Sequence, residues 1–439
     1  MSTHRPSSRD LPARHPRFAR TPPVRLVLGA AVAAVVFAAC GGSDDIGSSD
    51  AADPPATGPS LTEPPVTAET RPLIEADPTT VPQVASSPVD VRISGLAALR
   101  GSLPEGAPEP AVPLEEIRSG GPPPDGIPPI DVPTFLPTDA VDFLEDNEPV
   151  LAVDIEGESR AYPVQILMWH EIVNDTIAGV PVSVTYCPLC NSAVAYDRRV
   201  GDRIVDFGTS GSLWNSALVM YDRQTETLWS HFSGAGIVGE LTDVQLDMFP
   251  VQTVPWRVWR DANPDGLVLS RETGFSRNYG RNPYPGYDNV NSTPFLFEGE
   301  VDGTFTAMTR IVGIERDGDA LGVPLFRLSE EQTVHATLAG DEIVVFWEPG
   351  TASALDAGSI ADGDDIGATG VFLTELDGDQ LTFTASDAGF VDDQTGSTWN
   401  LLGRAVDGPL DGSRLDRIAH LDTFWFAWAA FQPDSALID

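Results

Sequence analysis

Two cysteines whose thiols could do chemistry, Cys187 and Cys190, stand at the junction of two predicted strands. An alternating apolar pattern over residues 182–186 predicts the first strand, and an apolar run over 193–196 predicts the second. Pro188 stiffens the backbone between the two thiols. The spacing therefore places two sulfur atoms at one strand-to-strand turn, where they could bind a soft metal ion or take part in disulfide chemistry.

Two histidines could complete a metal site with these cysteines. Thiolates and imidazoles are donors that suit Cu(I) and Zn(II). His170 precedes the first strand by one hairpin-like segment, and His231 follows in the same half of the chain. We therefore predict a copper or zinc site with Cys187, Cys190 and His170 as ligands and His231 as a further candidate. The sequence has no second Cys-x-x-Cys, so a standard zinc ribbon is not expected.

Two other functions stay open for the same pair. Pro188 directly after Cys187 could open a short helix and lower the pKa of the thiol, as a thiol–disulfide oxidoreductase would need. The residues after Cys190 predict a strand, however, and not the long helix of a thioredoxin-like fold. The third possibility is a structural disulfide in a surface interaction module. The sequence leaves open whether the protein is an enzyme.

The chain is strongly acidic, with 439 residues, a net charge of −39 and arginine as its only fixed cation. An acidic surface repels phosphates, so we expect no nucleic-acid partner. The charge identifies no small-molecule or protein partner.

The N-terminus has the pattern of an exported protein. Arginines up to Arg25 precede an apolar run over residues 26–39, which is too short for a comfortable transmembrane span. Small residues then precede Cys40, and the whole segment resembles a bacterial lipoprotein signal. The resemblance implies cleavage before Cys40, a lipid on its sulfur, and anchoring at the extracytoplasmic face of the cell membrane. Exported thiols such as Cys187 and Cys190 are expected to be oxidised, metal-bound or catalytic.

The rest of the chain contains an internal repeat. Residues 150–158 match 311–319 with a shift of 161 (311 minus 150), and residues 222–230 match 392–400 with a slightly different shift. Because one register holds over several blocks, we predict two pseudo-symmetric tandem repeats that form a two-lobed body. The second copy contains neither cysteine, so the site is expected in the first copy alone.

Each copy reads as short strands bounded by Asp-Gly turns, with a tryptophan-bearing helix near its end, at 256–260 and 423–431. We therefore predict a mainly β fold with a few helices.

The expected ranges are a signal peptide 1–39, a disordered acidic tether 40–89, a Pro/Gly-rich opening segment 90–149, a first repeat 150–275 with the Cys/His site, a connecting segment 276–310 and a second, degenerate repeat 311–439. The connecting segment is dense in arginine and tyrosine and could fold over the site.

Four segments resemble the domain-of-unknown-function family 3179, namely residues 169–175, 185–193, 207–222 and 277–284. The similarity covers roughly residues 114–436, which is nearly the whole mature chain. The resemblance implies no established reaction and no established ligand.

Overall fold

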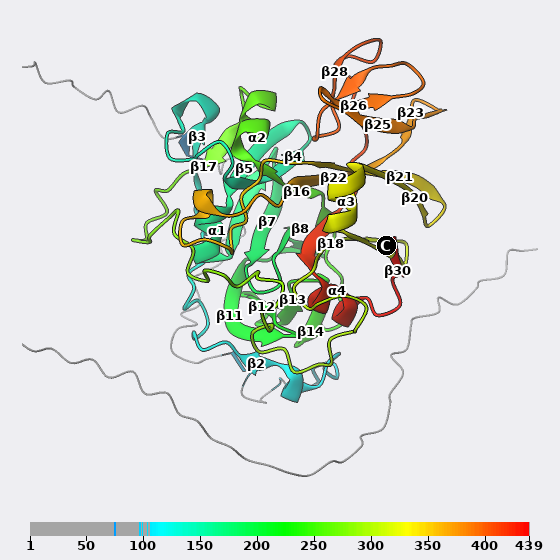
Figure 1. Cartoon of the computed structure of the whole chain (residues 1–439). Helices are drawn as coiled ribbons and strands as arrows, with labels where there is room; N and C mark the ends of the chain where they lie inside the picture. Colours follow the sequence, from blue (N-terminus) through cyan, green and yellow to red (C-terminus); the bar gives the residue numbers. More distant parts are fainter. Residues whose placement is uncertain (1–73, 76–95, 98, 100–102, 104–105, 439) are drawn as a thin grey trace, which may run out of the picture. The chain divides into compact units, whose positions relative to one another are not determined.

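The computed structural model describes residues 74–75, 96–97, 99, 103 and 106–438 (Figure 1). The predicted signal peptide, Cys40 and nearly all of the predicted tether lie outside these residues. Within the described part of the chain, no helix has both the length and the apolar character needed to cross a membrane.

The described residues form many short strands and four α-helices, so the prediction of a mainly β fold with a few helices is confirmed. The helices are α1 (Val164–His170), α2 (Trp256–Ala262), α3 (Leu325–Glu331) and α4 (Trp425–Phe431). A proline ends the strand before α1, α2 and α3. Its missing N–H cannot continue the strand ladder, and its fixed φ suits the start of a helix. The predicted helices at 256–260 and 423–431 correspond to α2 and α4.

Three sheets belong to the first half of the described chain. The largest has the order β1-β3-β17-β5-β4-β16, with β1 (Ile74–Glu75), β3 (Thr134–Pro137), β4 (Pro149–Ile155), β5 (Glu158–Pro163), β16 (Val251–Pro255) and β17 (Leu267–Leu269). The second has the order β15-β8-β7-β6, with β6 (Ile172–Ile177), β7 (Val180–Cys187), β8 (Ser192–Asp197) and β15 (Met248–Phe249). The third has the order β14-β13-β12-β11-β2, with β2 (Arg118–Ser119), β11 (Phe207–Trp214), β12 (Ala217–Asp222), β13 (Leu228–Ser230) and β14 (Gly236–Val238). A small hairpin joins β9 (Arg199–Val200) to β10 (Arg203–Ile204).

The second half also forms three sheets and one small hairpin. The first sheet has the order β29-β18-β19-β30, with β18 (Arg310–Arg316), β19 (Asp319–Pro324), β29 (His420–Phe424) and β30 (Ala436–Leu437). The second contains β20 (Thr333–Leu338), β21 (Asp341–Glu348) and β22 (Ala368–Leu373). The third contains β25 (Phe383–Ser386), β26 (Gly389–Asp392), β27 (Thr398–Trp399) and β28 (Ala405–Asp407), and the hairpin joins β23 (Glu375–Leu376) to β24 (Asp379–Gln380).

The two halves share connectivity and one side-chain motif. The order β29-β18-β19-β30 has the connectivity of β16-β4-β5-β17, including a parallel pair in each sheet, although β17 also pairs with β3 on its other side. In the first half, Trp229 donates its indole hydrogen to the carboxylate of Asp222 at 2.9 Å; in the second half, Trp399 donates to Asp392 at 3.0 Å.

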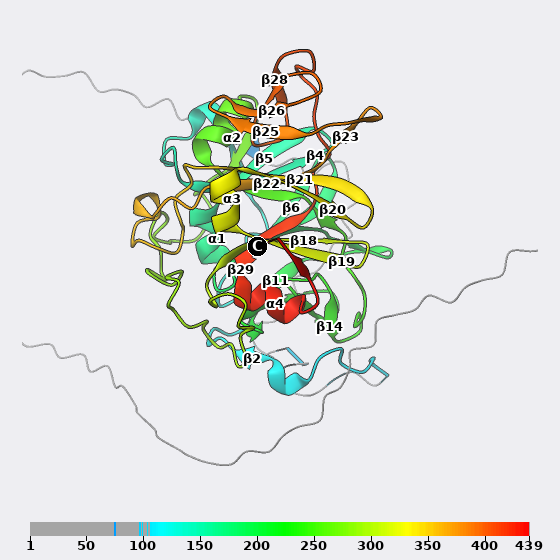
Figure 2. The ribbon, with the colours of Figure 1, turned by 45° about the vertical axis from the view of Figure 1, so that its right-hand side comes forward.

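The hydrophobic core is shared by the two halves. One cluster of buried side chains contains Tyr162 and Trp229 together with Phe424 and Trp428 from the second half. Another combines Trp256 of the first half with aromatic residues of the second. Strand β29 of the second half lies against β8 of the first, near the turn that carries the cysteines (Figures 1 and 2). The two halves therefore share two clusters of buried side chains, while a smaller cluster in each half is built from that half alone.

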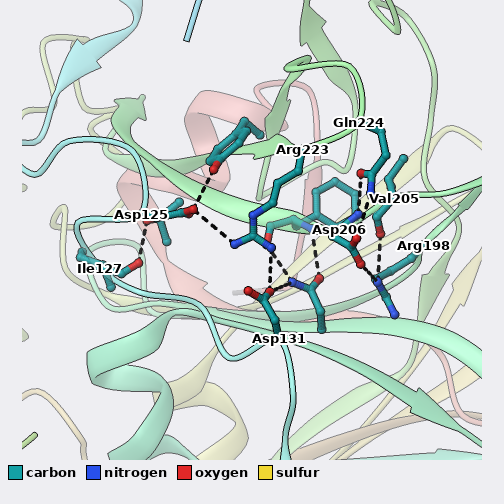
Figure 3. A network of polar contacts seen from close by, with 12 residues as sticks. Asp125, Ile127, Asp131, Arg198, Val205, Asp206, Arg223 and Gln224 are labelled. Carbon is teal, nitrogen blue, oxygen red and sulfur yellow. Dashed lines mark hydrogen bonds and ion pairs between the residues drawn. The ribbon is translucent and has the colours of Figure 1, made fainter. Parts of the chain in front are cut away.

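A polar network fixes the Pro/Gly-rich opening segment to the first half (Figure 3). Asp131 accepts hydrogen bonds from Asn174 at 2.8 Å and from Arg223 at 2.7 Å. Asp125 accepts from the hydroxyl of Tyr221 at 2.8 Å. These carboxylate contacts hold a segment whose prolines cannot donate to a strand ladder.

Candidate functional site

The two cysteines lie on a tight turn between neighbouring strands. Strand β7 ends at Cys187 and β8 begins at Ser192, and these two residues face each other across the antiparallel ladder. Asn191 has a positive φ of 53°, which lets the chain reverse within the four intervening positions. Both thiols are free, with only 2% of Cys187 and 0% of Cys190 exposed. The turn thus holds two buried sulfur donors between paired strands.

A line of polar atoms leads from the turn to His231. The sulfur of Cys190 lies 3.0 Å from the hydroxyl oxygen of Ser192, which lies 3.4 Å from Nδ1 of His231. The backbone of His231 is held by a bond from its N–H to the carbonyl of Leu218 at 3.1 Å and by the Tyr196 hydroxyl, which donates to its carbonyl at 2.7 Å. The other ring nitrogen, Nε2, is buried and has no hydrogen-bond partner among the described residues.

Burial keeps both kinds of donor neutral. Burial raises the pKa of the Cys187 thiol, and the neighbouring Cys190 raises it further. Burial lowers the pKa of His231, against a smaller opposing effect from Cys187. At neutral pH the site therefore contains an uncharged imidazole beside an uncharged thiol, and an incoming cation would change both protonation states.

His170 has different partners. It ends α1, and its ring is fully buried. Nδ1 donates to the carbonyl of Pro128 at 2.6 Å, and Nε2 lies 2.7 Å from the hydroxyl oxygen of Tyr279. Burial lowers the pKa of this histidine too. Both ring nitrogens thus contact the opening and connecting segments, toward which the end of α1 directs the ring.

No group of three or more His, Cys, Asp or Glu side chains in the described part of the chain is arranged to hold a metal ion. Ser192 links His231 to the cysteine turn, whereas both ring nitrogens of His170 have other hydrogen-bond partners. A site at the turn accordingly rests on its two sulfur atoms, with His231 as a neighbour.

The connecting segment covers the turn. The hydroxyl of Tyr287 donates to the carbonyl of Leu189, inside the turn, at 2.9 Å. Burial raises the pKa of Tyr284. The nearby buried carboxyl of Glu171 and the thiol of Cys187 raise it further. Burial and Cys187 together raise the pKa of Glu171. The tyrosines therefore exclude water from the thiols.

The second half of the chain holds the same turn from another side. Thr423 of β29 donates its hydroxyl hydrogen to the carbonyl of Cys190 at 2.7 Å, and the N–H of Phe424 reaches that carbonyl at 3.2 Å. The side-chain amide of Asn191 donates to the carbonyl of Asp422 at 3.3 Å. Sequence reasoning missed Ser192 and Thr423; a hydroxyl residue 233 positions from Cys190 gives no local signal.

A small cavity of about 40 Å³ adjoins the turn. Its lining includes Tyr186 and Asn191 from the turn, with Arg310, Asp422 and Thr423 from the second half. A water molecule needs roughly 10–15 Å³ of such space, so this cavity is large enough for water or a small ion.

The fold and the turn define a mainly β protein with a buried pair of free cysteines clamped between two topologically similar halves. The family model described as "Protein of unknown function (DUF3179)" matches residues 124–435, and the chain belongs to this family. No curated protein and no solved structure matches the chain.

Proposed function

We propose that the protein binds one Cu(I) ion between the sulfur atoms of Cys187 and Cys190. The observation that carries this proposal is the pair of free, buried thiols on one turn, which Ser192 links to Nδ1 of His231. The other nitrogen of this imidazole is buried and lacks a hydrogen-bond partner among the described residues. Soft thiolate ligands select Cu(I). Structural zinc sites take four ligands, and the turn offers fewer donors, so copper fits better than zinc.

Binding releases protons in a defined number. Cu(I) and two neutral thiols give a copper dithiolate with one negative charge and two protons. The ion supplies the stabilisation that burial denies to the free thiolates. Neutral His231 is the base beside the turn and takes up one of the two protons, so the buried group carries no net charge. The second proton leaves to solvent.

His170 acts as a positioning residue in this proposal. Its bond to Tyr279 ties α1 to the connecting segment, whose later tyrosines cover the turn. Loss of this bond loosens the cover and leaves both sulfur donors in place.

Thiol–disulfide exchange receives less support from the geometry. Exchange needs an accessible thiolate, whereas both thiols are buried and the pKa of Cys187 is raised. The residues after Cys190 form strand β8 and provide no helix N-terminus to stabilise a thiolate. A structural disulfide is the other alternative, and both appear as outcomes of the experiment below.

The location follows from the lipoprotein signal. We propose that Cys40 carries the lipid, that the residues before it are removed, and that the chain from 40 onward lies on the extracytoplasmic face of the cell membrane. Copper delivered outside the cytoplasm would then reach a site on an anchored protein.

We also propose that the two halves arose by duplication. The matching sequence register, the shared sheet connectivity and the Trp–Asp bond present in both halves support this origin. The second half has no cysteine between β21 and β22, where the counterpart of the cysteine turn falls. In this account the first half keeps the metal donors and the second half, through Thr423, holds the turn in shape.

Copper analysis and a free-thiol count on anaerobically purified full-length protein test the proposal. We expect one copper per chain, lost in the Cys187→Ser, Cys190→Ser double variant and kept in Cys40→Ser, which removes a cysteine outside the pair. Absence of copper binding with an easily reduced disulfide would support exchange chemistry instead. Absence of copper binding with a reduction-resistant disulfide would support a structural role.

A further inference from the structure

A second cavity, distinct from the cysteine turn, is lined by three arginines. Its volume is about 210 Å³, and it lies where the β4–β5 hairpin and α2 of the first half meet residues 402–417 of the second. The charged side chains that line it are Asp154, Arg404, Arg414, Asp416 and Arg417. Three guanidinium groups thus face two carboxylates, which is a local excess of positive charge in a chain whose net charge is −39.

The arginines are held in place by backbone and amide oxygens. Arg404 donates to the carbonyl of Ala262 and to the side-chain oxygen of Asn263, both at 2.7 Å. Arg417 donates to the backbone carbonyl of Asp154 at 2.8 Å. These neutral acceptors orient the guanidinium groups without cancelling their charge.

One carboxylate is shared among several arginines. Asp154 lies 3.3 Å from Arg414 and 3.5 Å from Arg404, and one of its oxygens also accepts a hydrogen bond from Ser159 at 2.7 Å. Burial, together with the charges of Arg414 and Arg417, lowers the pKa of Arg404. The positive charge in this cavity is therefore only partly compensated by the protein itself.

We propose that this cavity binds a small oxyanion, with phosphate or a terminal phosphoryl group as the chemical class, held by Arg404, Arg414 and Arg417. Arginine presents a planar set of N–H donors that matches the oxygens of phosphate in pairs. The cavity is smaller than the roughly 300–1,000 Å³ of pockets for drug-sized ligands, so it suits the anion or the end group of a larger molecule. An anion would supply the negative charge that the two carboxylates do not.

Calorimetric titration of the full-length protein with inorganic phosphate, in phosphate-free buffer of low ionic strength, tests this inference. Glycerol 3-phosphate in a parallel titration distinguishes the free anion from a phosphoryl ester, and tighter binding of either one supports the site. We expect saturable binding whose affinity falls at least tenfold in Arg414→Gln. The Arg414 side chain is 55% exposed and lies outside the core, so its removal should leave the fold intact. Arg417→Gln should weaken it as well.

The matched control is Arg203→Gln, which removes an exposed arginine paired with Glu240 and should leave the affinity unchanged. Phosphate should also raise the unfolding temperature of the wild-type and control proteins but not of Arg414→Gln. The inference is wrong if neither anion binds saturably, or if Arg414→Gln and Arg203→Gln bind phosphate with the same affinity. Binding should persist in the Cys187→Ser, Cys190→Ser variant, which separates this site from the copper proposal.

Discussion

The hydroxyl oxygen of Ser192 lies 3.0 Å from the sulfur of Cys190, at the point where β8 leaves the cysteine turn. The same hydroxyl lies 3.4 Å from Nδ1 of His231. One side chain thus connects a thiol to the nearest base. If the turn binds copper, this hydroxyl orients a ligand and connects it to the group that takes up a proton.

The first prediction concerns Ser192. Ser192→Ala removes the hydroxyl but leaves both sulfur atoms, so copper still binds. We expect the affinity to fall by about tenfold, because groups that orient metal ligands contribute on the order of 10–100-fold. Competition against a coloured Cu(I) chelator measures the change. The matched control is Ser183→Ala in β7, whose buried hydroxyl has no partner among the described residues and whose loss should leave copper affinity unaltered.

The second prediction concerns the acid stability of the metal-free protein. Burial holds the pKa of His231 below its ordinary value of about 6.5 in the folded chain. As the pH falls through that value, the unfolded chain takes up a proton that the folded chain does not. The free energy of unfolding therefore decreases with decreasing pH in this window.

His231→Leu removes this contribution and introduces the residue type found at the equivalent position in the second half, Leu401. We expect a smaller loss of stability between pH 7 and pH 5 than in the wild type, measured by urea unfolding. The pKa of His170 is also lowered, so its contribution to the pH dependence of stability is present in both proteins. The exposed His335→Gln serves as the control; an equal reduction of the pH dependence there would contradict the assignment to His231.

The third prediction concerns a buried ion pair in the first half. Nη1 of Arg160 lies 2.5 Å from Oδ2 of Asp175, and the two side chains are only 6% and 1% exposed. The hydroxyl of Tyr162 also donates to Asp175. Asp175→Ala removes the buried partner of Arg160 and leaves it only the more exposed carboxylate of Glu158, so it should cost about 3–5 kcal/mol in the free energy of unfolding.

The second half has Leu321 and Ala336 at the positions equivalent to Arg160 and Asp175. The double variant Arg160→Leu, Asp175→Ala should consequently be more stable than Asp175→Ala alone, as seen in denaturant unfolding. A double variant that loses more stability than the single one would show that the arginine left without its buried partner is not what destabilises the protein.

The fourth prediction concerns the clamp from the second half. Thr423→Val removes the hydroxyl that donates to the carbonyl of Cys190 but keeps the side-chain shape. We expect a loss of about 0.5–1.5 kcal/mol in stability, the usual net contribution of one hydrogen bond, and weaker copper binding. Thr333→Val, at a partly exposed position in β20, should change neither property. Unchanged copper affinity in Thr423→Val would mean that β29 does not shape the turn.

The sequence was most informative where the signal is local. Alternation before Cys187 and the apolar run after it predicted a turn between two strands, and the structure places β7 and β8 there. The tryptophan pairs predicted α2 and α4. The α1 and α3 helices have the same length of 7 residues but contain no tryptophan pair at i and i+3, so no local pattern indicated them.

The candidate site was only partly predictable. Spacing identified Cys187 and Cys190, but the direction of His170 depends on Pro128 and Tyr279, which lie 42 and 109 positions away. The contact between Thr423 and Cys190 spans 233 positions and depends on how the two halves pack. No pattern of residue types within a short window carries such information.

X-ray absorption at the copper edge, on the full-length protein loaded anaerobically with one equivalent of Cu(I), tests the central claim most directly. We predict two sulfur neighbours around copper, a signal retained in His170→Gln and abolished in Cys187→Ser, Cys190→Ser. Copper surrounded by nitrogen and oxygen alone, or a sulfur signal unaffected by the double substitution, would contradict the claim that this cysteine turn is the metal site.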